Sequence, residues 1–205
     1  SKLFDVTTTA YRSEFARNWY KLDKVRDSTG TKSSIGSILD DPTAYDDAYD
    51  ILKGQTSTNS DALFVKANNR EYYAQGVQTV LGFNFETGKV KHDIDLGFRI
   101  HQDQIDRFQW IDEYAMDNGV MMLTEAGEHG TESNRVETAN AIASYLQYKL
   151  KFWNFTITPG VRFEQINIDR KDYGKEDPTR TGVDLSERSN NTNVLCRCLC
   201  LPQLF

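Results

Sequence analysis

The protein has 205 residues, with 24 basic and 30 acidic side chains and a formal net charge of -6. This acidic balance argues against a nucleic-acid partner, because binding to phosphates relies on an excess of Lys and Arg. No run approaches the roughly 18 apolar residues that mark a membrane-spanning helix, so the sequence also argues against a helical membrane protein.

Alternation of polar and apolar residues predicts five β-strands and the start of a sixth. The predicted strands span residues 3–20, 70–85, 92–110, 139–150 and 155–168. Pro159 has no N–H to donate, so it predicts a bulge or a strand end in the fifth segment.

The third segment contains the clearest alternation, in the stretch "HDIDLGFRI" at residues 92–100. Asp93, Asp95 and Arg99 fall on one face, whereas the intervening positions carry aliphatic and aromatic side chains. Two all-β folds fit such a strand. A soluble sandwich would bury the apolar face in a core, and a transmembrane barrel would turn it toward lipid around a wet lumen.

The lengths of the connections favour the barrel. The segments at 70–85 and 92–110 are joined by the short turn "ETGK", where Gly88 supplies the positive φ that a tight hairpin needs. The short turn "KFWN" joins the segments at 139–150 and 155–168, and the other connections are long and polar. Alternating short and long connections are typical of an outer-membrane barrel, with tight turns on one side and long loops on the other.

Aromatic residues predict two belts at the membrane interfaces, where rings with one polar and one apolar end are favoured. The belt expected beside the tight turns comprises Phe83, Phe85, Phe152, Trp153 and Phe155. The belt expected near the long loops comprises Tyr11, Phe15, Trp19, Phe108 and Trp110.

The first long loop contains one predicted helix, in "DDPTAYDDAYDILKG". Asp41 suits the N-cap, Pro42 suits the first helical position, and Gly54 suits the end of the helix. The carboxylates that follow Pro42 lack the ligand rhythm of a calcium loop, so they predict a solvated helix face and no metal site.

The three cysteines all lie in the last ten residues, at Cys196, Cys198 and Cys200. A metal site is the weaker interpretation, since no His and no second Cys pair accompany them. We expect residues 196–205 to be an atypical tail that arises from truncation or a shifted reading frame, and residues 1–195 to form the barrel portion.

Four stretches resemble TonB-dependent outer-membrane receptors. They read "VTTTAYRSEFARNWYKLDKV", "NNREYYAQGVQTVLGFNF", "HDIDLGFRIHQDQIDRFQW" and "FTITPGVRFEQI", and the resemblance extends over residues 1–195. Their order and the aspartate-rich loop before "NNREYYAQGVQ" are most similar to the ferric-citrate type of that family.

The resemblance implies a fold, a function and a location. The family has a barrel of about 22 strands filled by an N-terminal plug, so five or six strands imply an internal barrel piece: an all-β, antiparallel, up-and-down portion with long extracellular loops. It implies uptake of an iron complex such as ferric citrate across the outer membrane of a Gram-negative bacterium. The expected partners are the iron chelate, outer-membrane lipid and, through the plug, the TonB complex.

If the ligand is an anionic iron complex, we expect arginines near the extracellular ends of the strands to bind it, because guanidinium forks bind carboxylates. Arg70, Tyr72, Arg107 and Gln109 are therefore the candidate ligand-binding residues. The competing interpretation is that these arginines pair with carboxylates of the wall or the plug. Arg99 with Asp95 and Arg162 with Glu164 are expected to be such charge pairs.

The sequence predicts no enzyme and no cofactor, because no catalytic motif accompanies its three histidines. Two alternatives stay open. In the first alternative the chain has the same barrel architecture but its ligand is another siderophore or a glycan, since the loops determine the ligand. In another class, the chain is a secreted β-sandwich that acts as a binding module.

Overall fold

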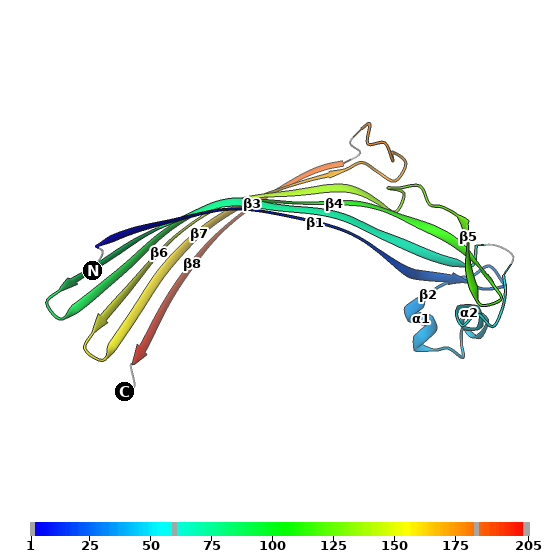
Figure 1. Cartoon of the computed structure of the whole chain (residues 1–205), viewed down its shortest axis with the longest axis horizontal. Coiled ribbons are helices and arrows are strands. Elements are labelled where there is room, and N and C mark those ends of the chain that lie inside the picture. Colours follow the sequence, from blue (N-terminus) through cyan, green and yellow to red (C-terminus); the bar gives the residue numbers. More distant parts are fainter. Residues whose placement is uncertain (1–2, 59–60, 183–184, 203–205) are drawn as a thin grey trace.

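The computed structural model describes residues 3–58, 61–182 and 185–202, and its main feature is a single antiparallel sheet of eight strands. The strand order is β2-β1-β3-β4-β6-β7-β8, with β5 paired to β4 (Figure 1). The strands are β1 (Phe4–Arg26), β2 (Lys32–Ser34), β3 (Leu63–Thr87), β4 (Val90–Asp117), β5 (Val120–Glu125), β6 (Ser133–Phe152), β7 (Phe155–Asp172) and β8 (Leu185–Pro202). Because the described strands form one layer, the β-sandwich alternative is wrong.

The long strands are neighbours in chain order, as in an up-and-down barrel wall. These strands are longer than the polar–apolar alternation of the sequence predicted, since β3 has 25 residues and β4 has 28. Both predicted tight turns lie at one end of the sheet, whereas the helices, the short β4–β5 hairpin and the β7–β8 connection lie toward the other end (Figure 1). The predicted sorting of short and long connections is therefore confirmed. Within the described residues, the structure contains no helix with the length and apolar character needed to cross a membrane.

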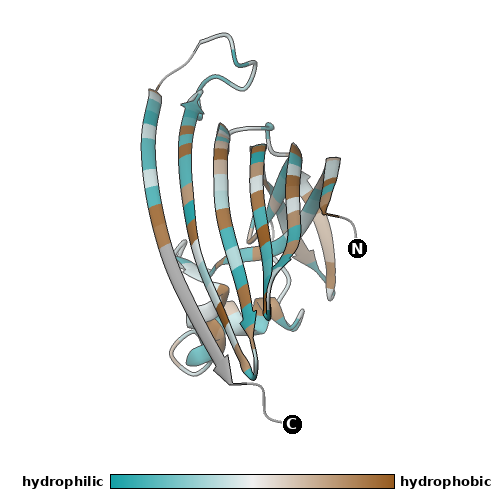
Figure 2. Cartoon of the chain, turned by 90° about the vertical axis from the view of Figure 1, so that its left-hand side faces the viewer, coloured by the Kyte–Doolittle hydropathy of each residue, from teal (hydrophilic) through white to brown (hydrophobic). Residues whose placement is uncertain are grey.

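The sheet has one apolar and one polar face, which the register aligns across all the long strands. We define the apolar face by the cross-strand row Val6, Leu81, Leu96, Leu146 and Val161. Figure 2 shows the resulting alternation of hydrophobic and hydrophilic bands along the strands. Large apolar side chains are left uncovered on this face, with Ile100 66% and Ile142 58% exposed. Such an uncovered apolar face is what a lipid-facing barrel wall presents.

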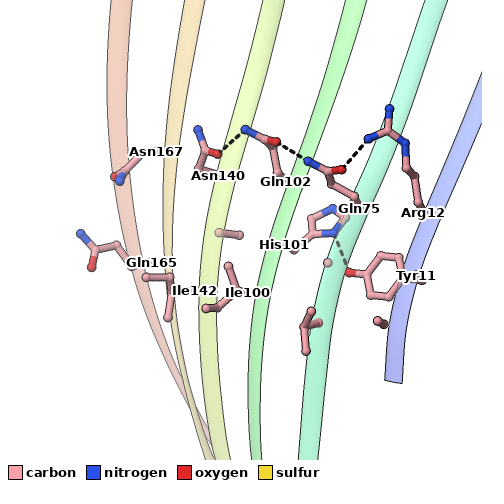
Figure 3. A pocket seen from close by; sticks show the side chains of 14 residues that line it. Tyr11, Arg12, Gln75, Ile100, His101, Gln102, Asn140, Ile142, Gln165 and Asn167 are labelled. Atoms are coloured by element: carbon pink, nitrogen blue, oxygen red, sulfur yellow. Dashed lines mark hydrogen bonds between the residues drawn. The ribbon is translucent and has the colours of Figure 1, made fainter. Parts of the chain in front are cut away.

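The apolar face ends at a row of amides. Arg12 donates to the Gln75 side chain (2.9 Å), Gln75 to Gln102 (2.8 Å), and Gln102 to Asn140 (2.9 Å). The row borders a hollow of about 880 Å³ that is also lined by Ile100 (Figure 3). Below this row, the apolar belt follows β4 for about ten residues, or roughly 25 Å in height for a strand tilted by about 40°. That height matches the hydrocarbon core that a barrel wall spans.

The two hairpins confirm the predicted tight turns. Thr87 pairs with Val90, and Gly88 between them has φ 62°. Phe152 pairs with Phe155, and Trp153 has φ 53° and is 81% exposed. The rings at this end of the apolar face form the first predicted belt.

The second predicted belt is wrong. Tyr11, Phe15 and Trp19 alternate onto the polar face, where Phe15 packs beside Tyr72. Trp110 is on the apolar side but is 6% exposed, because it stacks on His129 at 3.6 Å. The position of an aromatic residue along its strand sets how close its ring lies to the long loops. Strand alternation and loop packing decide which face of the sheet the ring occupies and whether it is covered.

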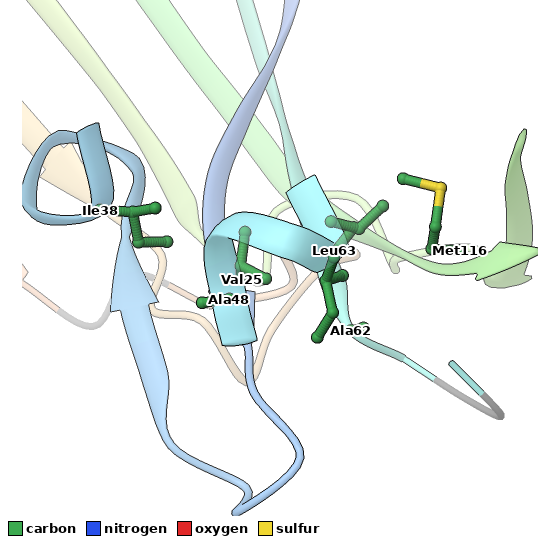
Figure 4. Packing of buried hydrophobic residues seen from close by; sticks show 7 residues of the cluster. Val25, Ile38, Ala48, Ala62, Leu63 and Met116 are labelled. Carbon is green, nitrogen blue, oxygen red and sulfur yellow. The ribbon is translucent and has the colours of Figure 1, made fainter. Parts of the chain in front are cut away.

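The buried core lies among the loops rather than beneath the sheet. Aliphatic side chains from β1, β3, β4 and both helices pack together there (Figure 4). The cluster consists of Val25, Ile38, Ala48, Ile51, Ala62, Leu63 and Met116. This packing fixes the first long loop against the strand ends.

The helical prediction was partly wrong, because the loop forms two short helices, α1 (Ile35–Asp40) and α2 (Asp46–Leu52). Ser34 caps α1 by accepting from the Ser37 N–H at 3.1 Å. Asp41 instead accepts from the Ala44 N–H at 3.2 Å, so it closes a turn between the helices. The predicted end is confirmed, since Gly54 follows α2 with φ 73°.

Pro159 and the cysteine segment lie on the last two long strands. The β6–β7 register is the same on both sides of Pro159, but pairing is interrupted between Gly160 and Ile157, so the predicted bulge or strand end is wrong. The β8 backbone remains paired to β7 as far as Pro202 and includes Cys196. Whether residues 196–205 are native to the fold stays a prediction.

Gly97 lets the Tyr145 ring lie across β4 on the polar face. A Cβ at Gly97 would lie 1.9 Å from Tyr145 Cε1. We expect Gly97→Ala to lower the free energy of unfolding by about 1 kcal/mol, because the ring must turn aside. In a Tyr145→Ala background the same change should cost little, and an equal loss in both backgrounds would contradict the contact. Denaturant titrations in lipid vesicles measure both values.

Candidate ligand-binding site

A row of arginines crosses the polar face above the apolar belt, toward the long-loop end. Arg17 pairs with Arg70, Arg70 with Arg107, and Arg107 with Arg135, so adjacent strands β1, β3, β4 and β6 each contribute one guanidinium group. Like charges on directly opposed positions of a sheet are unfavourable. A row of four such residues is therefore an electrostatic cost that an anion would relieve.

The half of the row on β1 and β3 is built around Tyr72. Its hydroxyl accepts from Arg17 at 3.3 Å and from Arg70 at 3.5 Å. The Arg17 guanidinium also stacks over the Trp19 ring at 3.9 Å. Within the described part of the chain, neither arginine forms an ion pair with a carboxylate. Both charges are thus held in place without being neutralised.

Amides hold the same half from the loop side. Asn68 accepts from the Arg70 Nε at 2.9 Å and from the Gln109 side chain. Gln109 is 5% exposed, and its backbone carbonyl accepts from the Gly130 N–H at 3.1 Å. The side chain of Gln109 therefore orients Asn68, and Asn68 in turn orients Arg70.

The other half of the row surrounds Glu137. Its carboxylate lies 3.6 Å from Arg107, 3.4 Å from Arg135 and 3.9 Å from Arg170. Within the residues that the structure describes, the buried Nε atoms of all three arginines lack a hydrogen-bond partner. Arg170 also binds Asp172 at 2.9 Å and lies 3.6 Å from Glu187. This half is balanced, with three arginines and three carboxylates, so the two positive charges in excess at the site are those of Arg17 and Arg70.

The titration behaviour agrees with a crowded positive site outside the apolar belt. Burial and then the charge of Arg135 lower the pKa of Arg107, against the opposing effect of Glu137. Burial tends to raise the pKa of Tyr72, but the hydrogen bonds and charges of Arg70 and Arg17 outweigh it and lower the pKa. The Tyr72 shift is the one expected where positive charge is in excess, whereas the Arg107 shift comes first from burial and only then from a neighbouring arginine.

The structure brings the four sequence-predicted residues together. Arg70, Tyr72, Arg107 and Gln109 all lie on the polar face in three consecutive rows of β3 and β4. The charge pair Arg162–Glu164 is confirmed at 3.0 Å, whereas Arg99 donates to the Tyr11 hydroxyl at 2.8 Å rather than to Asp95.

Sequence reasoning missed Arg17, Arg135 and Glu137. The "ETGK" turn fixes which residues of β3 and β4 face each other, so the pairing of Arg70 with Arg107 could have been read from the sequence. Long loops separate Arg17 and Arg135 from that hairpin. No local signal sets their register.

Comparison with known proteins supports the barrel fold but does not identify the ligand. No family model and no curated protein matches the chain. Among solved structures, the ferric citrate transporter FecA in its unliganded form is 22% identical, with a TM-score of 0.56 over 69% of this chain and 20% of that one.

Two other solved structures cover more of the chain. The siderophore receptor PiuA from Acinetobacter baumannii is 12% identical, with a TM-score of 0.59 over 97% of this chain and 27% of that one. The ferric-catecholate import receptor Fiu from E. coli K12, in its open form, is 11% identical, with a TM-score of 0.54 over 98% of this chain and 30% of that one. The chain therefore has the fold of a portion of the β-barrel of iron-complex receptors, and it spans less than a third of their length.

Proposed function

We propose that this chain is part of an outer-membrane receptor of the TonB-dependent class that takes up an anionic iron complex of the ferric-citrate type. The single observation that carries the proposal is the row Arg17, Arg70, Arg107 and Arg135. Guanidinium groups on adjacent strands present forked donors about 5 Å apart, a spacing that suits the carboxylates of a compact chelate. Arg70, Tyr72, Arg107 and Gln109 are the proposed ligand-binding residues.

The apolar belt supports a location in the outer membrane of a Gram-negative bacterium. Its exposed aliphatic side chains would contact lipid, and the polar face would line the lumen. We further propose that residues 1–195 belong to the barrel and that residues 196–205 are atypical. Energy would come from the TonB complex through a plug contributed by the rest of the receptor.

A second candidate is a catecholate siderophore, which is favoured by the aromatic residues at the site. Trp19 is 62% exposed and Phe15 is 57% exposed, and both flank Arg17 on the polar face. Aromatic ligands stack on such rings and on guanidinium planes. The carboxylate ligand is preferred because the arginines outnumber the rings and extend across four strands.

Uptake of radioactive iron by cells that produce the complete receptor containing this chain distinguishes these ligands. Ferric citrate is expected to supply iron and to bind to the outer-membrane fraction, and a ferric catecholate is expected to do neither at the same concentration. Uptake of the catecholate alone would transfer the proposal to the second candidate. Uptake of neither complex would contradict an iron-complex receptor of either kind.

A further inference from the structure

Glu137 occupies the part of the arginine row formed by Arg107 and Arg135, whose side chains are 27% and 25% exposed. It lies within 4 Å of Arg107, Arg135 and Arg170, and its own side chain is only 25% exposed. A carboxylate in this position resembles the group that an anionic ligand would bring. The question is whether it is a permanent partner of the arginines or one that a ligand replaces.

Glu137 contacts its arginines with poor hydrogen-bond geometry. Its oxygens form ion pairs at 3.4 to 3.9 Å, and they form no hydrogen bond with the arginines that they neutralise. A well-matched carboxylate would make forked contacts at about 2.7–2.9 Å. For comparison on the same face, Glu164 accepts a hydrogen bond from Arg162 at 3.0 Å. Among the described residues, the buried Nε donors of Arg107, Arg135 and Arg170 thus have no hydrogen-bond acceptor, which a better-matched carboxylate would supply.

Because Glu137 faces only Arg107 and Arg135 within the arginine row, the row has one half with a carboxylate partner and one half without. Among the described residues, Arg17 and Arg70 both donate to the Tyr72 hydroxyl and Arg70 also donates to Asn68, so an anion meets no competing carboxylate there. Arg107 and Arg135 already face Glu137. An anion with one carboxylate would engage the first half, whereas engaging both halves requires a second carboxylate that takes the place of Glu137.

We propose that Glu137 is an internal competitor of the ligand: it occupies Arg107 and Arg135 until a second carboxylate of the ligand replaces it, so it lowers the affinity of the site for polycarboxylate complexes and leaves monocarboxylate binding at Arg17 and Arg70 unchanged. This inference rests on the proposed function and adds the role of Glu137 as a partner of Arg107 and Arg135 that the ligand displaces. No bond is made or broken; one carboxylate exchanges for another on Arg107 and Arg135.

The test is Glu137→Gln in the receptor as its cells produce it, purified in detergent. Dissociation constants are measured for ferric citrate and for acetate by titration of protein fluorescence. We expect the variant to bind ferric citrate about fivefold more tightly, the size of one partly exposed charge pair, with little change for acetate. Glu164→Gln is the matched control and should leave the ratio of the two constants unchanged.

Three results would overturn the proposal: unchanged ferric citrate binding, tighter binding of both anions by the same factor, or loss of both anions, which would make Glu137 a structural partner. These results differ from failure of the proposed function. In that case the unaltered protein would bind neither ferric citrate nor acetate, whatever residue stands at 137.

Discussion

Arg70→Ala is expected to weaken the binding of ferric citrate by about ten- to a hundredfold. Arg70 lies between Arg17 and Arg107 in the row, and its Nε is fixed by Asn68 at 2.9 Å. A hydrogen bond to a charged group contributes about 1.5–3 kcal/mol, which corresponds to that loss in affinity. Calorimetric titration of the purified receptor measures the change.

The matched control for Arg70 is Arg162→Ala. Arg162 is on the same polar face but pairs with Glu164 at 3.0 Å, inside the height of the apolar belt. Its removal should leave the dissociation constant of ferric citrate within about twofold of the original. Equal losses in the two variants would show a general effect of lumen charge and would remove the row from the proposed site.

Leu146→Arg is expected to lower the free energy of unfolding in lipid vesicles by about 2–4 kcal/mol, the cost of a basic side chain near the bilayer midplane of a barrel. Leu146 is 42% exposed and pairs with Leu96 and Val161 in the middle of the apolar face. Denaturant titration of the refolded protein in phospholipid vesicles provides the measurement.

Gln147→Arg places the same side chain one residue along β6, on the polar face. There it lies opposite Asp95 and Gly160, where an arginine would be solvated and would gain an acidic neighbour. We expect almost no loss of stability. A destabilisation equal to that of Leu146→Arg would contradict the assignment of the two faces.

Much of the wall could be predicted because strands and tight turns are local. Alternation in residues 92–100 assigned the faces of β4, and Gly88 fixed the β3–β4 hairpin. The same hairpin brought Arg70 opposite Arg107. These features depend on positions a few residues apart, which a single sequence contains.

The rest depends on contacts between distant segments. Trp110 is covered by His129 from a loop, and Asp41 closes a turn rather than capping a helix. Arg17 joins the site only because β1 pairs with β3 across the first long loop. The sequence does not encode such pairings as a local pattern, so they had to come from the structure.

The most direct test of the account is the accessibility of spin labels placed one at a time at residues 94–99 of β4 in lipid vesicles, after the three native cysteines are changed to Ser. Labels at Ile94, Leu96 and Phe98 should collide with oxygen dissolved in the lipid. Labels at Asp95, Gly97 and Arg99 should collide instead with a water-soluble nickel complex. If the two sets show equal accessibility, or if both are shielded from lipid and water, the strands do not form a wall between lipid and an aqueous lumen.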